Sequence, residues 1–142
     1  MLRIPSDLAA FIYIRSAGDD SLWVDSETRR IRQWCADCDC FGMIRNGELV
    51  GMTMFEADGT LHFARIVEDQ MKPASTKDFV KWVEILSWGI GRFGRLKTAI
   101  RHSNVKTIKL AQKAGFKQSG EDAKRKYFDL DLENYRFMGL VL

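Results

Sequence analysis

The sequence predicts an α/β (α+β) fold in which capped helices flank strands that pair mainly antiparallel. An Asn-Gly pair at 46–47 and an Asp-Gly pair at 58–59 separate three apolar-rich runs at the spacing of β-hairpins. Segment 124–132 alternates between apolar and polar residues, as half-buried strands do. The 142 residues suit a single domain, residues 1–142, because one core of this size buries roughly two thirds of the unfolded surface.

Four helices are expected, each after a residue that can cap it. The first should stop near Gly18, and the third should be largely buried because apolar residues surround most of its circumference. The expected caps are Ser6 or Asp7, Asp25 or Ser26, Ser75 or Thr76, and Asn104.

The expected strands lie at 40–45, 48–56, 60–67, 95–100 and 124–132. In the last of them Phe128, Leu130 and Leu132 should face one side, because successive side chains of a strand point to opposite faces.

The fourth helix separates charge from apolar surface. Gly115 can take the left-handed conformation that ends a helix. The side that packs on the core consists of Thr107, Ile108, Leu110, Ala111 and Ala114. The opposite arc carries Lys106, Lys109, Lys113 and Lys117.

Charge is divided unevenly along the chain. Residues 1–70 have seven arginines and twelve acids, whereas residues 71–142 have fifteen lysines or arginines and seven acids. A basic half favours an anionic ligand, although ordinary solvated lysines explain it equally well. Nucleic acid ranks last among the possible ligands, because no aromatic residues interleave with the lysines to stack on bases.

Three cysteines, in the run CADCDC at 35–40, are odd in number and suit a reducing compartment. A metal site is not expected, because no second Cys or His pair stands at zinc-finger spacing. No apolar run reaches the roughly 18 residues that span a bilayer, and no signal-peptide pattern is present. We therefore expect a cytoplasmic protein without a membrane partner.

The segment from Asn104 to Phe116 resembles a motif of the GCN5-related N-acetyltransferases, the GNAT superfamily. The spacing of Asn104, Thr107, Lys113, Gly115 and Phe116 is similar to the pattern Asn-x-x-(Ala/Ser)…Lys-x-Gly-Phe of that family, with Thr107 at the Ala/Ser position. The order of the expected elements also matches over nearly the whole chain. The resemblance implies a mixed, mostly antiparallel sheet of about six to seven strands with about four helices.

The resemblance also implies that acyl-coenzyme A lies between two splayed central strands, the fourth and fifth. Its pyrophosphate would meet backbone N–H groups at the start of the long third helix, a general property of helix amino termini. The matching loop, QMKPAS at 70–75, has Pro73 and Ser75 where the family has small residues. A strand backbone N–H would stabilise the transition state. The implied acetyl-CoA contacts are Ile66, Val67, Gln70, Lys72, Ala74, Ser75, Thr76 and Asn104.

The family proton donor is replaced, because Ala111 stands where many members have tyrosine. Tyr127 could replace that donor, and Glu68 or His62 could accept the amine proton, but an ordinary role as a core or surface residue explains each of them better. We assign no catalytic residue from the sequence.

The expected function is transfer of an acetyl group from acetyl-CoA, a small-molecule acyl donor, to a primary amine. The alternative is a pseudoenzyme, a catalytically inactive GNAT-fold module that has a binding or structural role. Such a module could bind a protein partner, and a phage-encoded virion component would be one example. The sequence does not disclose the amine, the acyl chain or the oligomeric state.

Overall fold

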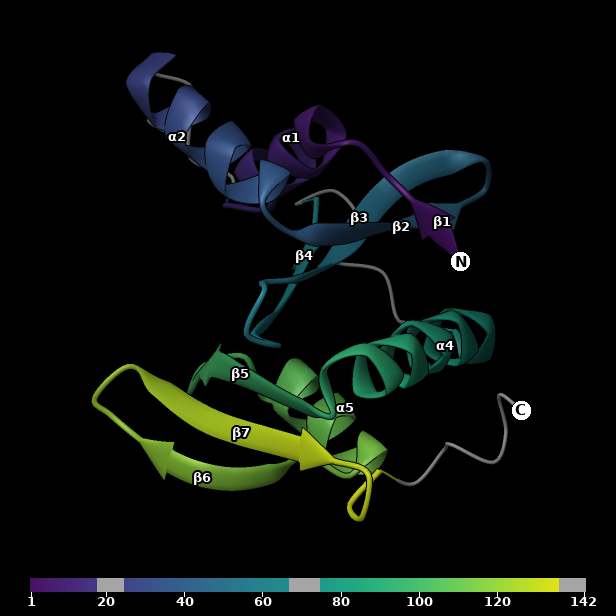
Figure 1. Cartoon of the computed structure of the whole chain (residues 1–142), viewed down its shortest axis with the longest axis vertical. Coiled ribbons are helices and arrows are strands. Elements are labelled where there is room, and N and C mark those ends of the chain that lie inside the picture. Colours follow the sequence, from purple (N-terminus) through teal and green to yellow (C-terminus); the bar gives the residue numbers. More distant parts are fainter. Residues whose placement is uncertain (18–24, 67–74, 136–142) are drawn as a thin grey trace. The chain divides into compact units, whose positions relative to one another are not determined.

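The computed structural model describes residues 1–17, 25–66 and 75–135. Within these residues the chain forms seven strands and four helices, in the order β1, α1, α2, β2, β3, β4, α4, β5, α5, β6, β7 (Figure 1). The strands form two hydrogen-bonded sheets, ordered β1-β2-β3-β4 and β5-β7-β6. The α+β class with four helices and mostly antiparallel strands is confirmed.

The chain divides into two compact units. The first unit comprises Met1–Ala57 and His62–Lys81, and the second comprises Asp58–Leu61 and Trp82–Leu142. The boundary therefore runs through two secondary-structure elements, β4 and α4. A single domain over residues 1–142 stays a prediction.

The four-stranded sheet is built on a tight hairpin. Strand β2 (Asp39–Arg45) pairs antiparallel with β3 (Glu48–Phe55), with Arg45 opposite Glu48. The turn residues Asn46 and Gly47 have φ of 53° and 80°, the positive values that a two-residue turn of type I′ requires. The hairpin predicted from the Asn-Gly pair is confirmed.

Two further strands complete this sheet. Strand β4 (Leu61–Arg65) follows the Asp58–Gly59 turn and neighbours β3. The two-residue strand β1 (Leu2–Arg3) pairs with β2 and was not expected, because two residues are too few to show a period. The expected strand 60–67 extends at its end into residues outside the described part.

Helices α1 (Ser6–Ala17) and α2 (Asp25–Ala36) cover one face of this sheet (Figure 1). Helix α1 begins at Ser6, because the Ala9 N–H donates to the carbonyl of Pro5 at 3.1 Å. The cap predicted at Ser6 or Asp7 is therefore wrong by one residue, and the expected stop at Gly18 lies outside the described residues. The buried side chains of the core are Ala9, Ala10, Ile12, Ile14, Ile31, Cys35, Cys40, Met52, Met54 and Ala64.

The three-stranded sheet places β7 (Arg125–Asp131) between β5 (Arg95–Arg101) and β6 (Lys117–Glu121). Phe128 and Leu130 on β7 are buried, as the alternation predicts. The prediction for Leu132 is wrong, since β7 ends at Asp131 and the Leu132 side chain is 61% exposed.

Helix α5 (Val105–Ala114) has both predicted ends. The Asn104 side chain accepts a hydrogen bond from the Thr107 N–H, and Gly115 takes the left-handed conformation with φ 112°. The predicted apolar face is confirmed for Ile108, Ala111 and Ala114, which are buried, whereas Thr107 and Leu110 are half-buried. Lys117 belongs to β6, so only the other three lysines of the predicted arc are on the helix.

Helix α4 (Thr76–Phe93) spans both units. Its prediction as a largely buried helix holds for Trp82, Val83, Ile85 and Leu86, whereas Val80 is 51% exposed. The helix is followed by Gly94, whose φ is 74° and whose N–H donates to the Ile90 carbonyl.

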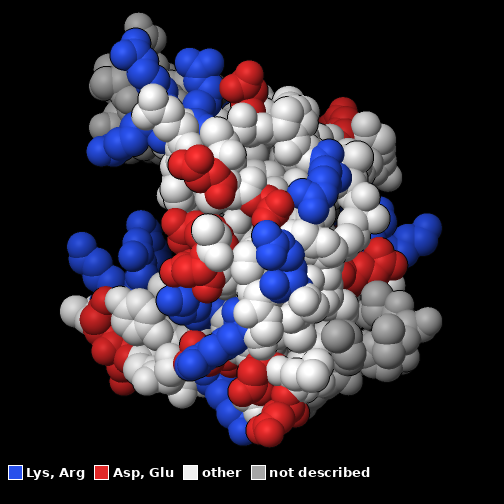
Figure 2. Space-filling view, viewed as in Figure 1, with Lys and Arg blue, Asp and Glu red and all other residues white. Residues whose placement is uncertain are grey.

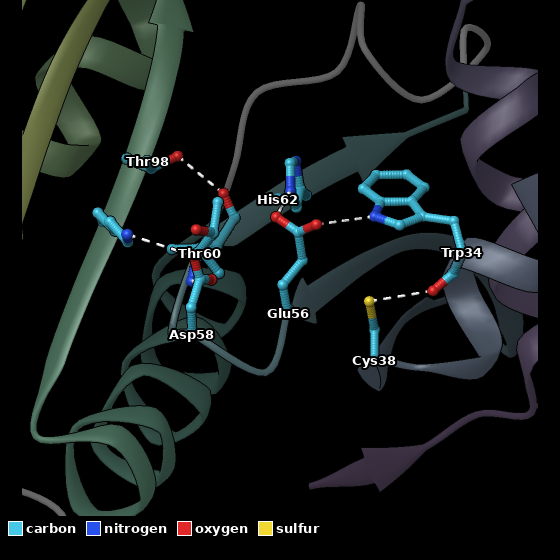
Figure 3. A network of polar contacts seen from close by, with 9 residues as sticks. Trp34, Cys38, Glu56, Asp58, Thr60, His62 and Thr98 are labelled. Carbon is cyan, nitrogen blue, oxygen red and sulfur yellow. Dashed lines mark hydrogen bonds and ion pairs between the residues drawn. The ribbon is translucent and has the colours of Figure 1, made fainter.

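A short parallel contact lies inside the second unit. An isolated bridge pairs Thr60 with Lys97, and the Lys97 N–H donates to the Gly59 carbonyl at 3.2 Å. The Thr98 hydroxyl donates to the Leu61 carbonyl at 2.9 Å (Figure 3). By their hydrogen bonds, β4 belongs to the four-stranded sheet and β5 to the three-stranded sheet. The resemblance implies such a separation between the fourth and fifth strands.

Charge is mixed on the face drawn in Figure 2, where basic and acidic side chains are interspersed. Among the described helices, none has the length and apolar content needed to cross a bilayer.

Candidate functional site

The amino terminus of α4 is capped by a reciprocal pair of hydrogen bonds. The Ser75 N–H donates to the Asp78 carboxylate at 2.9 Å, and the Asp78 N–H donates to the Ser75 hydroxyl oxygen at 3.2 Å. This is a capping box, with aspartate in the third helical position. The predicted cap at Ser75 is confirmed, and its partner Asp78 was missed although the spacing Ser-x-x-Asp is visible in the sequence.

A cation from the neighbouring hairpin reaches the same carboxylate. The Arg45 guanidinium, at the end of β2, lies 3.0 Å from Asp78, and the two side chains are only 16% and 9% exposed. Burial alone would raise the pKa of the Asp78 carboxyl. The hydrogen bonds from Ser75 and the charge of Arg45 prevail, so the pKa is lowered and Asp78 is ionised at neutral pH.

Half of the implied acetyl-CoA contacts fall outside the described residues, namely Val67, Gln70, Lys72 and Ala74. Ile66, Ser75 and Thr76 lie in the first unit and Asn104 lies in the second. The Ile66 N–H donates to the Val50 carbonyl at 2.9 Å, so this N–H is engaged within the sheet. A backbone donor for the transition state therefore stays a prediction for Val67.

Asn104 is engaged locally. Its side-chain oxygen accepts from the Thr107 N–H at 3.3 Å, which satisfies one of the first N–H groups of α5. The side-chain amide nitrogen is not used by this cap. A contact between Asn104 and the acyl donor stays a prediction.

The three cysteines are free thiols in the first unit. Burial raises the pKa of Cys35 to about 11. Burial, assisted by nearby negative charge, raises the pKa values of Cys38 and Cys40 to about 12. Within the described ranges, no group of three or more His, Cys, Asp or Glu side chains is arranged to hold a metal ion.

A polar cluster joins α2 to the β3–β4 turn (Figure 3). The Glu56 carboxylate accepts from the Trp34 indole N–H at 2.9 Å and lies 3.0 Å from Nε2 of His62. The rings of Trp34 and His62 meet edge to face, with centroids 4.8 Å apart. Sequence reasoning named His62 but missed Glu56. Their positions on either side of the turn at 58–59 could have indicated that they are neighbours.

The other acid–base candidates are less favourable. Tyr127 donates its hydroxyl to the Asp122 carboxylate, and this hydrogen bond raises the pKa of the phenol, which makes it a weaker acid. Glu68 lies outside the described residues, and Ala111 is buried in α5.

The sequence matches no protein-family model and none of the curated proteins with which it was compared. Solved structures do match the fold. The N-acetyltransferase PseH from Campylobacter jejuni, solved in complex with acetyl coenzyme A, is 15% identical, with a TM-score of 0.63. The match covers 92% of this chain and 97% of PseH.

Two other solved structures agree. An acetyltransferase of the GNAT family from Streptococcus pneumoniae is 16% identical with a TM-score of 0.60, covering 89% of this chain and 92% of that chain. A chimera of the spermidine N-acetyltransferase SpeG from Vibrio cholerae and hSSAT is 11% identical with a TM-score of 0.69, covering 94% and 96%. At these identities the likeness concerns the fold, and the chain is a divergent protein with the GNAT fold.

Proposed function

We propose that this protein is an N-acetyltransferase that transfers an acetyl group from acetyl-CoA to a primary amine. The observation that carries the proposal is the GNAT fold, which covers 89 to 94% of the chain in matches to proteins named as acetyltransferases. Because one fold can host different functions, the proposal needs support from the site itself.

The start of α4 can hold an anion, although its capacity is reduced. The first N–H groups of a helix have no partner within the helix. The backbone N–H groups of Ser75 and Asp78 donate to each other's side chains in the capping box. The N–H groups of Thr76 and Lys77 take no part in that capping box. We propose that these two groups, with the exposed Lys77 side chain, hold part of the acetyl-CoA pyrophosphate.

Other contacts of the acyl donor are proposed from the family pattern. Gln70, Lys72 and Ala74 would extend the anion site, and the Val67 N–H would stabilise the negative charge that develops on the acetyl oxygen. Asn104 would add a polar contact through its amide nitrogen.

The second candidate is an inactive GNAT-fold module that binds a protein partner, and the Arg45–Asp78 pair favours it. An ionised carboxylate already neutralises the positive end of α4 and the nearby guanidinium. An incoming pyrophosphate would be repelled by the Asp78 carboxylate. Because that side chain is only 9% exposed, water screens the repulsion little.

Titration calorimetry with acetyl-CoA separates the two candidates. Saturable binding, followed by acetyl-CoA-dependent acetylation of an amine detected by mass spectrometry, is expected for the transferase. A suitable amine panel contains spermidine, glucosamine and a lysine-containing peptide. Desulfo-coenzyme A controls for binding without the reactive thiol.

Absence of binding at millimolar acetyl-CoA would overturn the transferase proposal and leave the module. If acetyl-CoA binds but no amine of the panel is acetylated, the result would count against catalysis by this protein. The proposal of an acyl-CoA site would still stand. Mass spectrometry is preferred to thiol reagents, because the chain has three cysteines of its own.

A further inference from the structure

The cluster of Trp34, Glu56 and His62 has the features of an acid–base site. Glu56 follows the last residue of β3 and His62 is the second residue of β4, so the intervening turn sets their side chains next to each other. Trp34 comes from α2 and holds the other carboxylate oxygen. Each oxygen of Glu56 therefore has its own donor (Figure 3).

The carboxylate selects one tautomer of His62. An ionised carboxylate only accepts hydrogen bonds, so the 3.0 Å contact requires a proton on Nε2 of His62. In the neutral ring this leaves Nδ1 with a lone pair. Within the described part of the chain, the contacts of His62 leave Nδ1 without a hydrogen-bond partner.

Exposure distinguishes this cluster from a core ion pair. The side chains of His62 and Glu56 are 33% and 35% exposed, so a ligand can reach the ring. The hydrogen bond from the Trp34 N–H to one carboxylate oxygen favours the orientation in which the other oxygen faces His62. The Cys38 thiol also lies near Glu56, and its pKa is raised to about 12, so this thiol is neutral at neutral pH.

We propose that His62 is the catalytic base that takes a proton from a primary amine, and that Glu56 is its positioning residue. This inference rests on the proposed acetyltransferase function. The amine nitrogen forms a bond to the acetyl carbonyl carbon, the carbon–sulfur bond breaks, and the thiolate leaves with its electron pair. The amine proton goes to Nδ1 of His62 and then to the thiolate or solvent.

Glu56 contributes in two ways. It stabilises the imidazolium that forms when Nδ1 is protonated, and its negative charge attracts a substrate that arrives as an ammonium ion. The substrate class is therefore a cationic primary amine. Its ammonium group loses one proton to solvent before attack and a second proton to Nδ1 of His62 as the carbon–nitrogen bond forms.

The test compares three variants with the wild type. His62→Gln removes the base, and Glu56→Gln keeps an acceptor for Trp34 while removing the charge. His102→Gln is the matched control. That histidine is 35% exposed like His62, but its Nε2 lies 2.8 Å from the Asp122 backbone carbonyl in the second unit.

We expect His62→Gln to lower kcat/KM for spermidine by about 100-fold or more, the usual contribution of a general base. The acidic limb of its pH profile should vanish. Glu56→Gln should also lower kcat/KM although Trp34 keeps its acceptor, and His102→Gln should leave both kcat/KM and the pH profile unchanged. Acetyl-CoA affinity should stay within about twofold in all three, because none of them touches the anion site.

Nitrogen-15 NMR gives a readout that does not depend on turnover. His62 should show a protonated Nε2 and an unprotonated Nδ1 at high pH, and Glu56→Gln should mix the tautomers. Wild-type turnover with an unchanged pH profile in His62→Gln would overturn this inference alone. Loss of acetyl-CoA binding in the wild type would instead overturn the proposed function, and the opposite tautomer would exclude Nδ1 as the base.

Discussion

The Arg45 guanidinium lies 3.0 Å from the Asp78 carboxylate at the first turn of α4, and both side chains are nearly buried. The pair places a negative charge at the amino terminus of α4, where we propose that the acetyl-CoA pyrophosphate binds. Asp78 stabilises the helix through the capping box, and under this proposal its charge repels the pyrophosphate.

Asp78→Asn should strengthen acetyl-CoA binding. The asparagine oxygen can still accept the Ser75 N–H, so the cap persists, whereas the charge that opposes the pyrophosphate is removed. We expect the dissociation constant to fall about fivefold to tenfold, equivalent to about 1 to 1.4 kcal/mol, at low salt. Calorimetry measures this change.

The control for this variant is Asp7→Asn, which removes an acid from the first turn of a different helix, α1. Its acetyl-CoA affinity should equal that of the wild type. Equal affinities in Asp78→Asn and the wild type would show that the carboxylate does not compete with the ligand.

Arg45→Met should destabilise the fold at neutral pH by about 2 to 4 kcal/mol, because it leaves the Asp78 charge buried without its partner. The Asp78 pKa is lowered by folding, so its ionisation stabilises the protein above the ordinary carboxyl pKa. That contribution is lost as pH falls. The difference between variant and wild type should therefore shrink below about pH 4.

Urea unfolding at several pH values measures this difference. Arg3→Met is the matched control, because Arg3 lies 2.9 Å from Asp39 on the same sheet with side chains 60% and 33% exposed. Such an exposed pair contributes about 1 kcal/mol or less. If Arg45→Met and Arg3→Met lower the free energy of unfolding by similar amounts, burial does not strengthen the Arg45–Asp78 pair.

Local chemistry explains which parts of the fold the sequence could predict. The Asn-Gly hairpin turn, the Asn104 cap and the Gly115 end were predictable because one or two residues determine each conformation. Ser6 was expected to cap α1, but the Pro5 carbonyl accepts the first helical hydrogen bond. Boundaries of this kind depend on backbone geometry that side-chain type does not fix.

The site residues depended on tertiary pairing and were harder to predict. Arg45 and Asp78 are neighbours because the β2–β3 hairpin approaches the start of α4, which no local period reveals. His62 was recognised as a candidate, but its role could not be weighed without Glu56. The loop at 67–74 carries four of the implied contacts and lies outside the described residues.

Asn104 can be tested with two substitutions that separate capping from ligand binding. Asn104→Ala removes the cap acceptor and should lower the free energy of unfolding by about 1 kcal/mol. Asn104→Asp keeps the acceptor and should retain stability. If the amide nitrogen contacts the acyl donor, both variants should bind acetyl-CoA more weakly. Full affinity in both would limit Asn104 to its capping role.

The cysteine thiols should react slowly in the native protein. Burial raises the pKa values from 9.0 to about 11 for Cys35 and about 12 for Cys40, so little thiolate is present near pH 8. The raised pKa values stabilise the fold fully below pH 9, and this contribution is lost as pH rises towards 11 to 12. Stability should therefore decline over that range.

Dithionitrobenzoate at pH 8 measures thiol reactivity, with the urea-unfolded protein as the fast reference. A Gln112→Cys variant provides an exposed thiol on α5 in the same folded chain. One thiol per molecule should react rapidly in this variant. Rapid reaction of all native thiols would contradict the effect of burial.

Two glycines with similar backbone angles separate conformational strain from steric overlap. Gly47 and Gly59 have φ of 80° and 87°, a region that costs a residue with a side chain about 1 to 2 kcal/mol. A Cβ at Gly47 would meet nothing within 4 Å, whereas a Cβ at Gly59 would lie 2.5 Å from the Arg95 carbonyl oxygen. Gly59 also accepts the Lys97 N–H, so its backbone cannot move away without breaking that hydrogen bond.

Gly47→Ala should therefore destabilise the protein by about 1 to 2 kcal/mol, and Gly59→Ala by about 3 kcal/mol or more, because a backbone atom cannot yield as a flexible side chain can. Urea unfolding of both variants gives the comparison. Gly94→Ala, with φ of 74° and open space around its Cβ, should match Gly47→Ala. Equal losses at Gly59 and Gly47 would show that the turn relaxes away from Arg95, and that the close approach of the two backbones is not required for the fold.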